Sequence, residues 1–343
     1  MRYLIGSKKE FFDFVDSIKK DDKIGILTHT DTDGIASAIF LEEILSKKGI
    51  KIEMIEFLRL KIGLFDEVSK KAKQKGITHL FLTDLSEGVD FEAFEKLRKD
   101  FKVFLIDHHP MKKEGWDKTN VIKTESADCS AWVIYELGKN LIDAKKWEWL
   151  VTATMVAEWS FNSEENLKFL IHKCEDINSK EDVFNSRAFF IAKIIAAANT
   201  CLENNLKKCY ELVKEKNLEE LEKYYEIVEE KLKKATIKYK EEAEYYPEKN
   251  MYFGYLRDSD LVSTSILISR ISRENPENIF LILSDLDDLS MKVSARCQNG
   301  GVNELLIKGI EGLKNATAGG HSKASGGSFL KKDLEKFKKN ILG

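Results

Sequence analysis

The sequence predicts an α/β protein with a parallel-sheet domain, a helical connector and a smaller α/β domain at the carboxyl-terminal end. Apolar segments alternate with helical segments between Lys23 and Asp107, as in a parallel sheet covered by helices. The chain is Lys/Glu-rich with a helical period between residues 199 and 246, and short apolar segments return after residue 250. Because 343 residues suit two domains, we place the boundaries at 1–160, 161–249 and 250–343.

The first domain is predicted from its apolar segments. Each is short and bounded by polar residues, which favours buried strands at Ile24–Leu27, Lys51–Phe57, His79–Thr83 and Lys102–Ile106. Segments with helical periodicity separate or follow them, and we expect helices at 7–19, 35–41, 66–76, 91–100, 128–137 and 146–159. This order implies a parallel sheet with helices on both faces.

The second domain follows the Lys/Glu-rich helices. Its apolar segments predict strands at Met251–Leu256, Ile279–Leu283 and Met291–Ala295. Helical periodicity predicts helices at Val262–Ile271 and Asn303–Ile310 and a basic helical tail.

Composition excludes several classes of protein. A net charge of −3 excludes a generally basic nucleic-acid binder, although a local basic groove remains compatible with it. The five cysteines form no Cys-x-x-Cys pair, which argues against a zinc ribbon and suits a reducing cytoplasm. The segment Met1–Phe12 lacks the apolar core of a signal peptide, and the apolar helix Phe189–Ala198 is too short to span a membrane. We therefore expect a cytoplasmic protein without a membrane partner.

Polar residues follow three of the predicted strands. The first set is His29, Asp31 and Asp33, the second is Asp84, and the third is Asp107-His108-His109. Alternate residues of an extended segment share one side, so the first three should point together. Because parallel strands end at one edge of a sheet, all three sets should converge there as metal ligands. For the first stretch alone, an Asp-Gly turn with a helix cap is the alternative.

A glycine-rich segment lies near the end of the chain. Two glycine pairs, Gly319-Gly320 and Gly326-Gly327, bracket His321. As a loop, this segment would bring backbone N–H groups and a cation to a phosphate.

These motifs together resemble the DHH family of phosphoesterases. The pattern His-x-Asp-x-Asp-Gly stands at 29–34, an Asp after a buried strand is Asp84, and Asp-His-His stands at 107–109. The segment Gly319–Gly327 resembles the DHH-associated domain of the RecJ-like branch, and Ser294-Ala295-Arg296 resembles that domain's substrate-contacting segment. The form Asp-Thr-Asp-Gly-Ile-Ala-Ser-Ala is similar to RecJ-type and archaeal members.

The resemblance implies two Mn²⁺ ions, with Mg²⁺ as a substitute. One ion would be held by three residues, His29, Asp31 and Asp84. The second would be held by four residues, with Asp84 bridging the two ions: Asp33, Asp84, His108 and Glu158. Glu158 departs from the family pattern, which usually carries Asp after a short apolar-Ala segment.

The resemblance also implies roles outside the ligand set. Asp107 would orient a histidine, and His109 would contact the scissile phosphate. Arg296 and His321 would hold substrate phosphates, together with the glycines of the carboxyl-terminal segment, Gly319, Gly320, Gly326 and Gly327.

The implied activity is that of a RecJ-like exonuclease that hydrolyses single-stranded DNA or RNA to mononucleotides. One alternative within the family is a nano-RNase or nucleotide phosphatase that acts on short oligonucleotides. An alternative of another class is a non-catalytic replication or repair subunit, and replication or repair proteins and a second copy of the chain are the protein partners considered.

Overall fold

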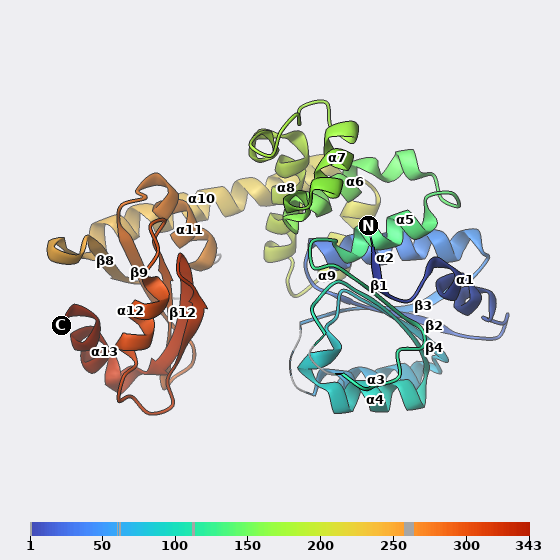
Figure 1. Ribbon diagram of the computed structural model, residues 1–343, viewed down its shortest axis with the longest axis horizontal. Coiled ribbons are helices and arrows are strands. Elements are labelled where there is room, and N and C mark those ends of the chain that lie inside the picture. The colour runs from blue at the N-terminus through green and yellow to red at the C-terminus, as the bar shows by residue number, and fades with distance from the viewer. Residues whose placement is uncertain (1, 60, 62, 112–113, 257–263) are drawn as a thin grey trace. The chain divides into compact units, whose positions relative to one another are not determined.

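The chain forms two compact units, Met1–Tyr225 and Glu226–Gly343, in a computed structural model that describes residues 2–59, 61, 63–111, 114–256 and 264–343 (Figure 1). The division falls inside helix α10 (Leu218–Glu242). Residues 161–249, the expected connector, are therefore shared between the two units.

The first unit contains a six-stranded sheet in the order β1-β6-β5-β4-β2-β3. The strands are β1 (Tyr3–Ile5), β2 (Ile24–His29), β3 (Ile52–Leu58), β4 (His79–Thr83), β5 (Lys102–Asp107) and β6 (Val121–Thr124). Strands β2 to β6 pair in parallel, which confirms the predicted class of fold, but β1 pairs antiparallel with β6. Strands β1 and β6 were not predicted because segments of three and four residues carry too little periodicity.

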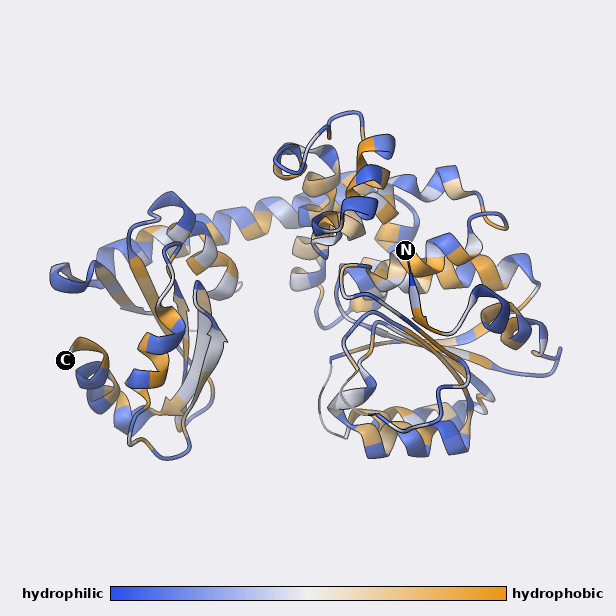
Figure 2. Ribbon diagram, in the orientation of Figure 1, coloured by the Kyte–Doolittle hydropathy of each residue, from blue (hydrophilic) through white to orange (hydrophobic). Residues whose placement is uncertain are grey.

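Helices cover both faces of this sheet (Figure 1). One face packs against α3 (Leu64–Lys75) and α4 (Phe91–Asp100), and the other against α1 (Lys8–Asp16), α2 (Thr32–Lys47) and α5 (Ser130–Gly138). Hydrophobic residues concentrate on the strands and on the helix faces turned toward them (Figure 2). The strands are therefore buried on both sides, as parallel strands usually are.

Four further α-helices lie wholly within the described part of the first unit. They are α6 (Ala144–Ala157), α7 (Glu164–Lys173), α8 (Arg187–Cys201) and α9 (Leu206–Lys214). Their apolar residues join the same core as α2 and α5. Among the residues that the structure describes, no helix combines the length and the apolar character needed to cross a membrane.

The second unit contains a second six-stranded sheet, in the order β11-β12-β10-β9-β8-β7. Its strands are β7 (Glu244–Tyr246), β8 (Met251–Tyr255), β9 (Ile279–Asp285), β10 (Ser290–Arg296), β11 (Thr317–His321) and β12 (Ala324–Leu330). Helices α12 (Val302–Gly309) and α13 (Leu334–Leu342) share its main core, and α11 (Thr264–Glu274) packs on β9 and β10. The predicted helix Val262–Ile271 corresponds to α11, and its first two residues lie outside the described part of the chain.

The glycine-rich segment is not the expected loop. It forms a hairpin in which β11 pairs antiparallel with β12, with Gly319 opposite Gly326. A Cβ atom on Gly320 would lie 2.5 Å from the Ala324 carbonyl oxygen, and one on Gly327 would lie 2.3 Å from the Thr317 carbonyl oxygen. Glycine is therefore required at both positions for the two strands to approach each other.

Candidate metal centre

The first set of site residues lies where β2 passes into α2. His29 is the last residue of β2, and Asp31 caps α2 by accepting a hydrogen bond from the Gly34 amide at 3.0 Å. Asp33 is already in the first helical turn, so the expectation that all three residues share one extended segment is wrong for Asp33. The helix starts early because the Asp31 carboxylate satisfies one of its unpaired amides. A Cβ atom on residue 34 would lie 2.1 Å from the His29 carbonyl oxygen, so only glycine fits there.

Asp84 follows β4 and occupies the middle of the site. Its φ of 56° places it in the left-handed region, which aspartate and asparagine enter more readily than most residues. Its side chain is buried, with Oδ1 3.4 Å from His108 Nε2 and Oδ2 3.6 Å from His29 Nδ1. This backbone conformation turns the carboxylate toward both histidines.

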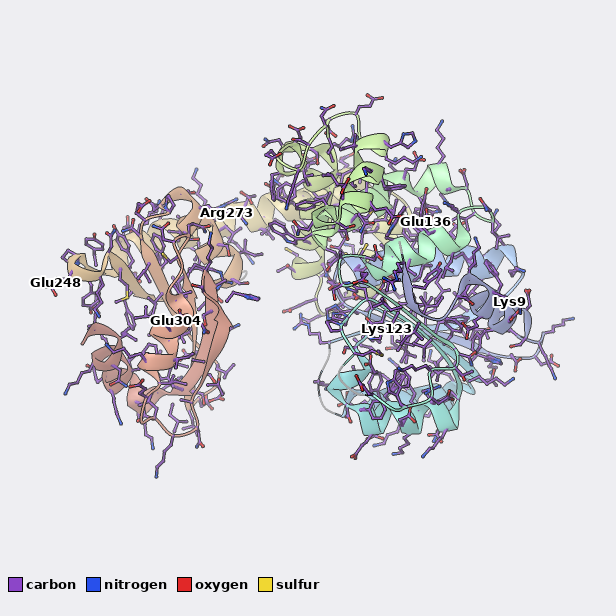
Figure 3. All side chains as sticks on the ribbon, viewed as in Figure 1. Lys9, Lys123, Glu136, Glu248, Arg273 and Glu304 are labelled. Carbon is purple, nitrogen blue, oxygen red and sulfur yellow. The ribbon has the colours of Figure 1, made fainter. Side chains whose placement is uncertain are left out.

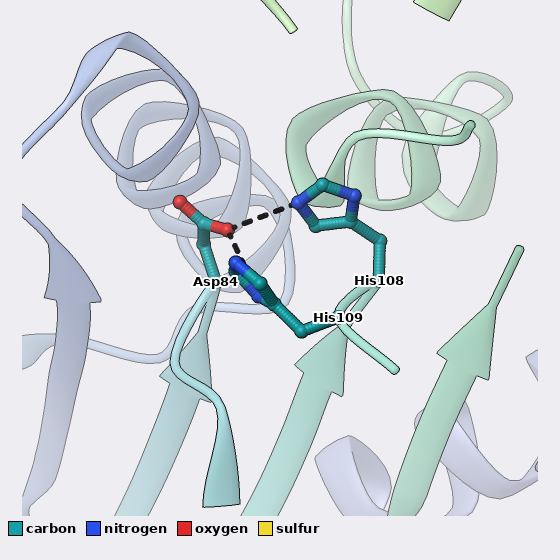
Figure 4. Close-up of side chains that lie close together, drawn as sticks. All are labelled: Asp84, His108 and His109. Carbon is teal, nitrogen blue, oxygen red and sulfur yellow. Dashed lines mark ion pairs between the residues drawn. The ribbon is translucent and has the colours of Figure 1, made fainter. Parts of the chain in front are cut away.

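The third set follows β5, which ends at Asp107. His108 and His109 come next in the chain and face Asp84 from the neighbouring strand end (Figure 4). His108 Nδ1 lies 3.3 Å from the Ser126 carbonyl oxygen, to which it donates a hydrogen bond. Nε2 of His108 then faces Asp84, so this nitrogen can bind a metal once it loses its proton, with the other ring nitrogen held by a carbonyl as metal-binding histidines usually are.

Two groups of potential ligand atoms share Asp84. His29, Asp31 and Asp84 form the first, Asp84, His108 and His109 form the second, and within each group the atoms lie within 4.8 Å of one another. Within the described residues, the buried Asp84 Oδ2 atom has no hydrogen-bond donor. A buried carboxylate oxygen without a donor, surrounded by imidazole and carboxylate groups, fits a divalent cation.

Asp33 and Glu158 lie at the border of these groups. Asp33 accepts hydrogen bonds from the Ser130 and Ala131 amides at the start of α5, at 2.8 and 2.7 Å, and its Oδ2 lies 3.8 Å from His108 Nε2. Glu158 is a half-buried residue that follows α6 as its C-cap. Both interact electrostatically with the other charged groups of the site.

Ionisation in this site reflects an excess of negative charge. Burial and the nearby Asp84 raise the pKa of Asp33 well above its usual range. Burial, followed by the charges of Asp31 and Asp84, raises the pKa of Glu158 to about 7. The structure thus concentrates carboxylates that a cation would stabilise in their charged form.

The same negative charge also raises the pKa of the histidines. Burial would lower the pKa of His29, but its interactions with Asp31 and Asp84 outweigh burial and raise it to about 10. The pKa of His108 also rises to about 10, because Asp84 and Asp33 outweigh the effect of burial. Without a metal, both imidazoles are therefore protonated on both ring nitrogens and positively charged near neutral pH.

Mn²⁺ affinity is therefore expected to increase with pH between about 6 and 8. Each ion must displace a proton from His29 or His108, and one released proton gives about a ten-fold gain in affinity per pH unit. Below pH 7 the increase should be steeper, because Glu158 must also lose a proton. Calorimetric Mn²⁺ titrations in buffers of different ionisation enthalpy would count the protons. A pH-independent affinity would contradict this assignment.

Asp107 holds His109 through a buried ionic network. His109 Nδ1 lies 2.7 Å from Asp107 Oδ1, and this hydrogen bond raises the pKa of His109, an effect that outweighs burial. Lys123 Nζ donates to Asp107 Oδ2 at 2.5 Å and lies 2.7 Å from Glu87 Oε2. Lys123, Asp107 and Glu87 are at most 1% exposed, and Lys123 lies within the first unit (Figure 3).

Sequence reasoning missed Lys123 and Glu87. A single lysine that follows the apolar pair Val121-Ile122 in β6 was the available signal, since a buried lysine needs a charged partner. The partners lie 16 and 36 residues away in the sequence. Such pairs become visible only when β5, β6 and the segment after β4 are assembled.

The predicted substrate residues of the second unit lie in one row of its sheet. Arg296 on β10 and His321 on β11 are both directly opposite Ala324 on β12, so the three side chains emerge on one face. Arg296 is half-buried and donates a hydrogen bond to the Ala295 carbonyl at 2.8 Å. Gly319 and Gly326 lie two positions along on the same face, where a Cβ atom on Gly319 would meet no described atom within 4 Å.

Comparison with known families agrees with this arrangement. Residues 23–158 match the DHH family, N-terminal domain. The matched segment contains both groups of potential ligand atoms and ends at Glu158. Comparison with curated proteins finds no match to the sequence.

Solved structures extend the likeness to both units. RecJ from Thermus thermophilus in complex with Mn²⁺ is 16% identical with a TM-score of 0.66, over 97% of this chain and 53% of that one. Exonuclease RecJ bound to manganese is 18% identical with a TM-score of 0.65, over 97% of this chain and 92% of that one. The DHH domain of a protein described as a member of a family of ribosomal proteins is 17% identical with a TM-score of 0.67, over 100% and 94%.

These likenesses show the fold. The chain has a RecJ-like fold of two sheet-containing units, and residues 23–158 in the first unit match the DHH family. It spans about half the length of the Thermus RecJ and nearly the whole of the other two structures.

Proposed function

We propose that this protein is a metal-dependent phosphodiesterase, and specifically a RecJ-like exonuclease for single-stranded DNA or RNA. The observation that carries the proposal is the pair of ligand groups that share Asp84 at the ends of β2, β4 and β5. Two divalent ions bound there would neutralise charge on the phosphodiester and activate water. The match of residues 23–158 to the DHH family supports the same reaction class.

The residues of the centre have distinct roles in this proposal. His29, Asp31 and Asp84 would hold one ion, while Asp84 and His108 would hold the other, together with Asp33 and Glu158. His109 uses Nδ1 to bond Asp107, so its Nε2 is left to bind the phosphate. Asp107 and Lys123 fix that imidazole in place.

Digestion of end-labelled single-stranded DNA and RNA ladders with Mn²⁺, resolved by length, would test this function. A ladder shortened one nucleotide at a time from one end would support an exonuclease and give its polarity and sugar preference. Cleavage confined to the shortest oligomers would instead support the nano-RNase alternative. Hydrolysis that continues in excess chelator would contradict the metal-dependent reaction, and no hydrolysis of any strand would favour a non-catalytic subunit.

Substitution of Arg296 by alanine is expected to raise KM for an oligonucleotide about ten- to a hundred-fold and to leave Mn²⁺ affinity unchanged. The guanidinium would provide a charge-assisted bond to phosphate, worth roughly 1.5–3 kcal/mol. Its described hydrogen bonds go to the backbone carbonyls of Ala295 and Ser325 and use one of its nitrogens, which leaves most of its N–H groups available for that bond.

Lys292→Ala is the matched control, because Lys292 is an exposed cation on the same strand. Steady-state kinetics and metal titration on both variants would check the prediction. A loss of bound metal in Arg296→Ala, with KM unchanged, would contradict the substrate role of Arg296.

A further inference from the structure

An aromatic surface begins at the residue that follows Glu158. Trp159 is 49% exposed, although tryptophan is usually highly buried. Its backbone has φ 57° and ψ 24°, in the left-handed region that bulky residues rarely enter. Backbone strain of this kind persists where the surrounding structure holds it, and it is concentrated at functional sites.

Three phenylalanines extend this surface, which we call the aromatic platform (Trp159, Phe161, Phe184 and Phe189). The centre of the Trp159 ring lies 5.4 Å from the centre of the Phe161 ring and 5.5 Å from that of Phe184. The ring centres of Phe184 and Phe189 are 5.6 Å apart. Phe161 is 2% exposed and anchors the platform, whereas Phe184 is 37% exposed. Trp159 and Phe184 thus present ring surface to solvent on a fixed base.

Lysines lie beside the platform. Lys180 Nζ is 5.9 Å from the centre of the Phe161 ring, and Lys193 Nζ is 5.3 Å from that of Phe189. Both are within the range of cation–π attraction. Aromatic rings interleaved with cations suit a ligand that alternates flat apolar groups with negative charges.

The platform is connected to the metal centre in two places. Trp159 is bonded to Glu158, whose carboxyl group interacts with Asp31 and Asp84. Helix α8 carries Phe189, and on the same helix Asn199 donates a hydrogen bond to the carbonyl of Thr30, the residue between His29 and Asp31. The platform therefore begins one residue from a proposed ligand of the metal centre, and a hydrogen bond ties its supporting helix to the β2–α2 segment that carries two others.

We propose that the aromatic platform stacks nucleobases next to the scissile phosphate and so selects nucleic acid over phosphate chains that lack bases. This proposal rests on the proposed phosphodiesterase function and assigns a nucleobase-binding site to it. Trp159 and Phe184 provide the stacking faces, and Lys180 and Lys193 neutralise nearby phosphates. A stacked base contributes affinity without reading sequence, because every base has a π-face.

The test compares two single-stranded oligomers of equal length and charge, one with bases and one built from abasic tetrahydrofuran residues. Trp159→Asn removes the ring and suits the left-handed backbone, so loss of folding is not expected. Trp159→Phe keeps a stacking face. Trp149→Ala is the control, because Trp149 is a half-buried tryptophan earlier on α6.

Trp159→Asn is expected to raise KM for the base-bearing oligomer about ten- to a hundred-fold, with kcat and cleavage of the abasic oligomer unchanged. Trp159→Phe should retain most of the affinity, and Trp149→Ala should match the wild type. Equal KM values for the two oligomers in the wild type would overturn the proposal, as would an unchanged KM in Trp159→Asn.

Tryptophan fluorescence quenching by each oligomer separates this proposal from the proposed function. If the wild type hydrolyses neither oligomer but binds the base-bearing one through Trp159, the platform is supported and the phosphodiesterase function fails. If the wild type hydrolyses both oligomers and Trp159→Asn binds the base-bearing one unchanged, the phosphodiesterase function stands. The nucleobase assignment is then overturned, and the surface fits a protein partner instead.

Discussion

Replacement of Asp84 by asparagine is expected to reduce metal-dependent hydrolysis more than about 100-fold. Loss of a residue that only supports a ligand typically costs about 10- to 100-fold, and Asp84 belongs to both ligand groups. Asparagine keeps the size of the side chain and tolerates the φ of 56° at this position. Alanine would add backbone strain to the loss of a ligand, so it is the less informative substitution.

Asp100→Asn provides the matched control for this variant. Asp100 pairs with Lys73 at 2.6 Å at the end of α4 and belongs to neither group of potential ligand atoms among the described residues. Mn²⁺ titration and single-turnover kinetics should show two ions bound by the control and weakened binding of both in Asp84→Asn. Near-normal rates in Asp84→Asn would mean that Asp84 does not bridge the two ions.

Replacement of Lys123 by methionine is expected to lower the free energy of unfolding by about 3–5 kcal/mol. The substitution removes the cation from between Asp107 and Glu87 and leaves two buried carboxylates without their shared partner. Methionine fills a similar volume, so a cavity contributes little to the effect. Urea unfolding of the metal-free protein would measure the change.

A second substitution separates charge from packing. Of the three residues in this network, Asp107 is the only charged one left in the double variant Lys123→Met/Glu87→Gln. It keeps its hydrogen bond from His109. Part of the lost stability should therefore return, as non-additivity between residues in contact. Lys102→Met, at an exposed position at the start of β5, should change stability by no more than about 0.5 kcal/mol. A similarly small change in Lys123→Met would show that the ion network contributes little.

The sequence by itself determined the parallel part of the first sheet and the place of its polar residues. Apolar segments of four to seven residues alternate with amphipathic helices, and this local pattern requires burial on both faces of a sheet. Since parallel strands end at one edge, the pattern also predicted that His29, Asp84 and His108 would meet there. The structure brings these residues together.

Tertiary structure decided which groups each of these side chains contacts. Asp33 accepts hydrogen bonds from backbone amides 97 and 98 residues away, and Lys123 forms ion pairs with carboxylates of two other segments. The glycine-rich segment became a hairpin because β12 also pairs with β10, a partner about 34 residues earlier. These contacts depend on how helices and strands pack, and no local periodicity encodes that packing. The left-handed backbone that exposes Trp159 has the same origin, because the contacts around the end of α6 hold a conformation that tryptophan rarely adopts by itself.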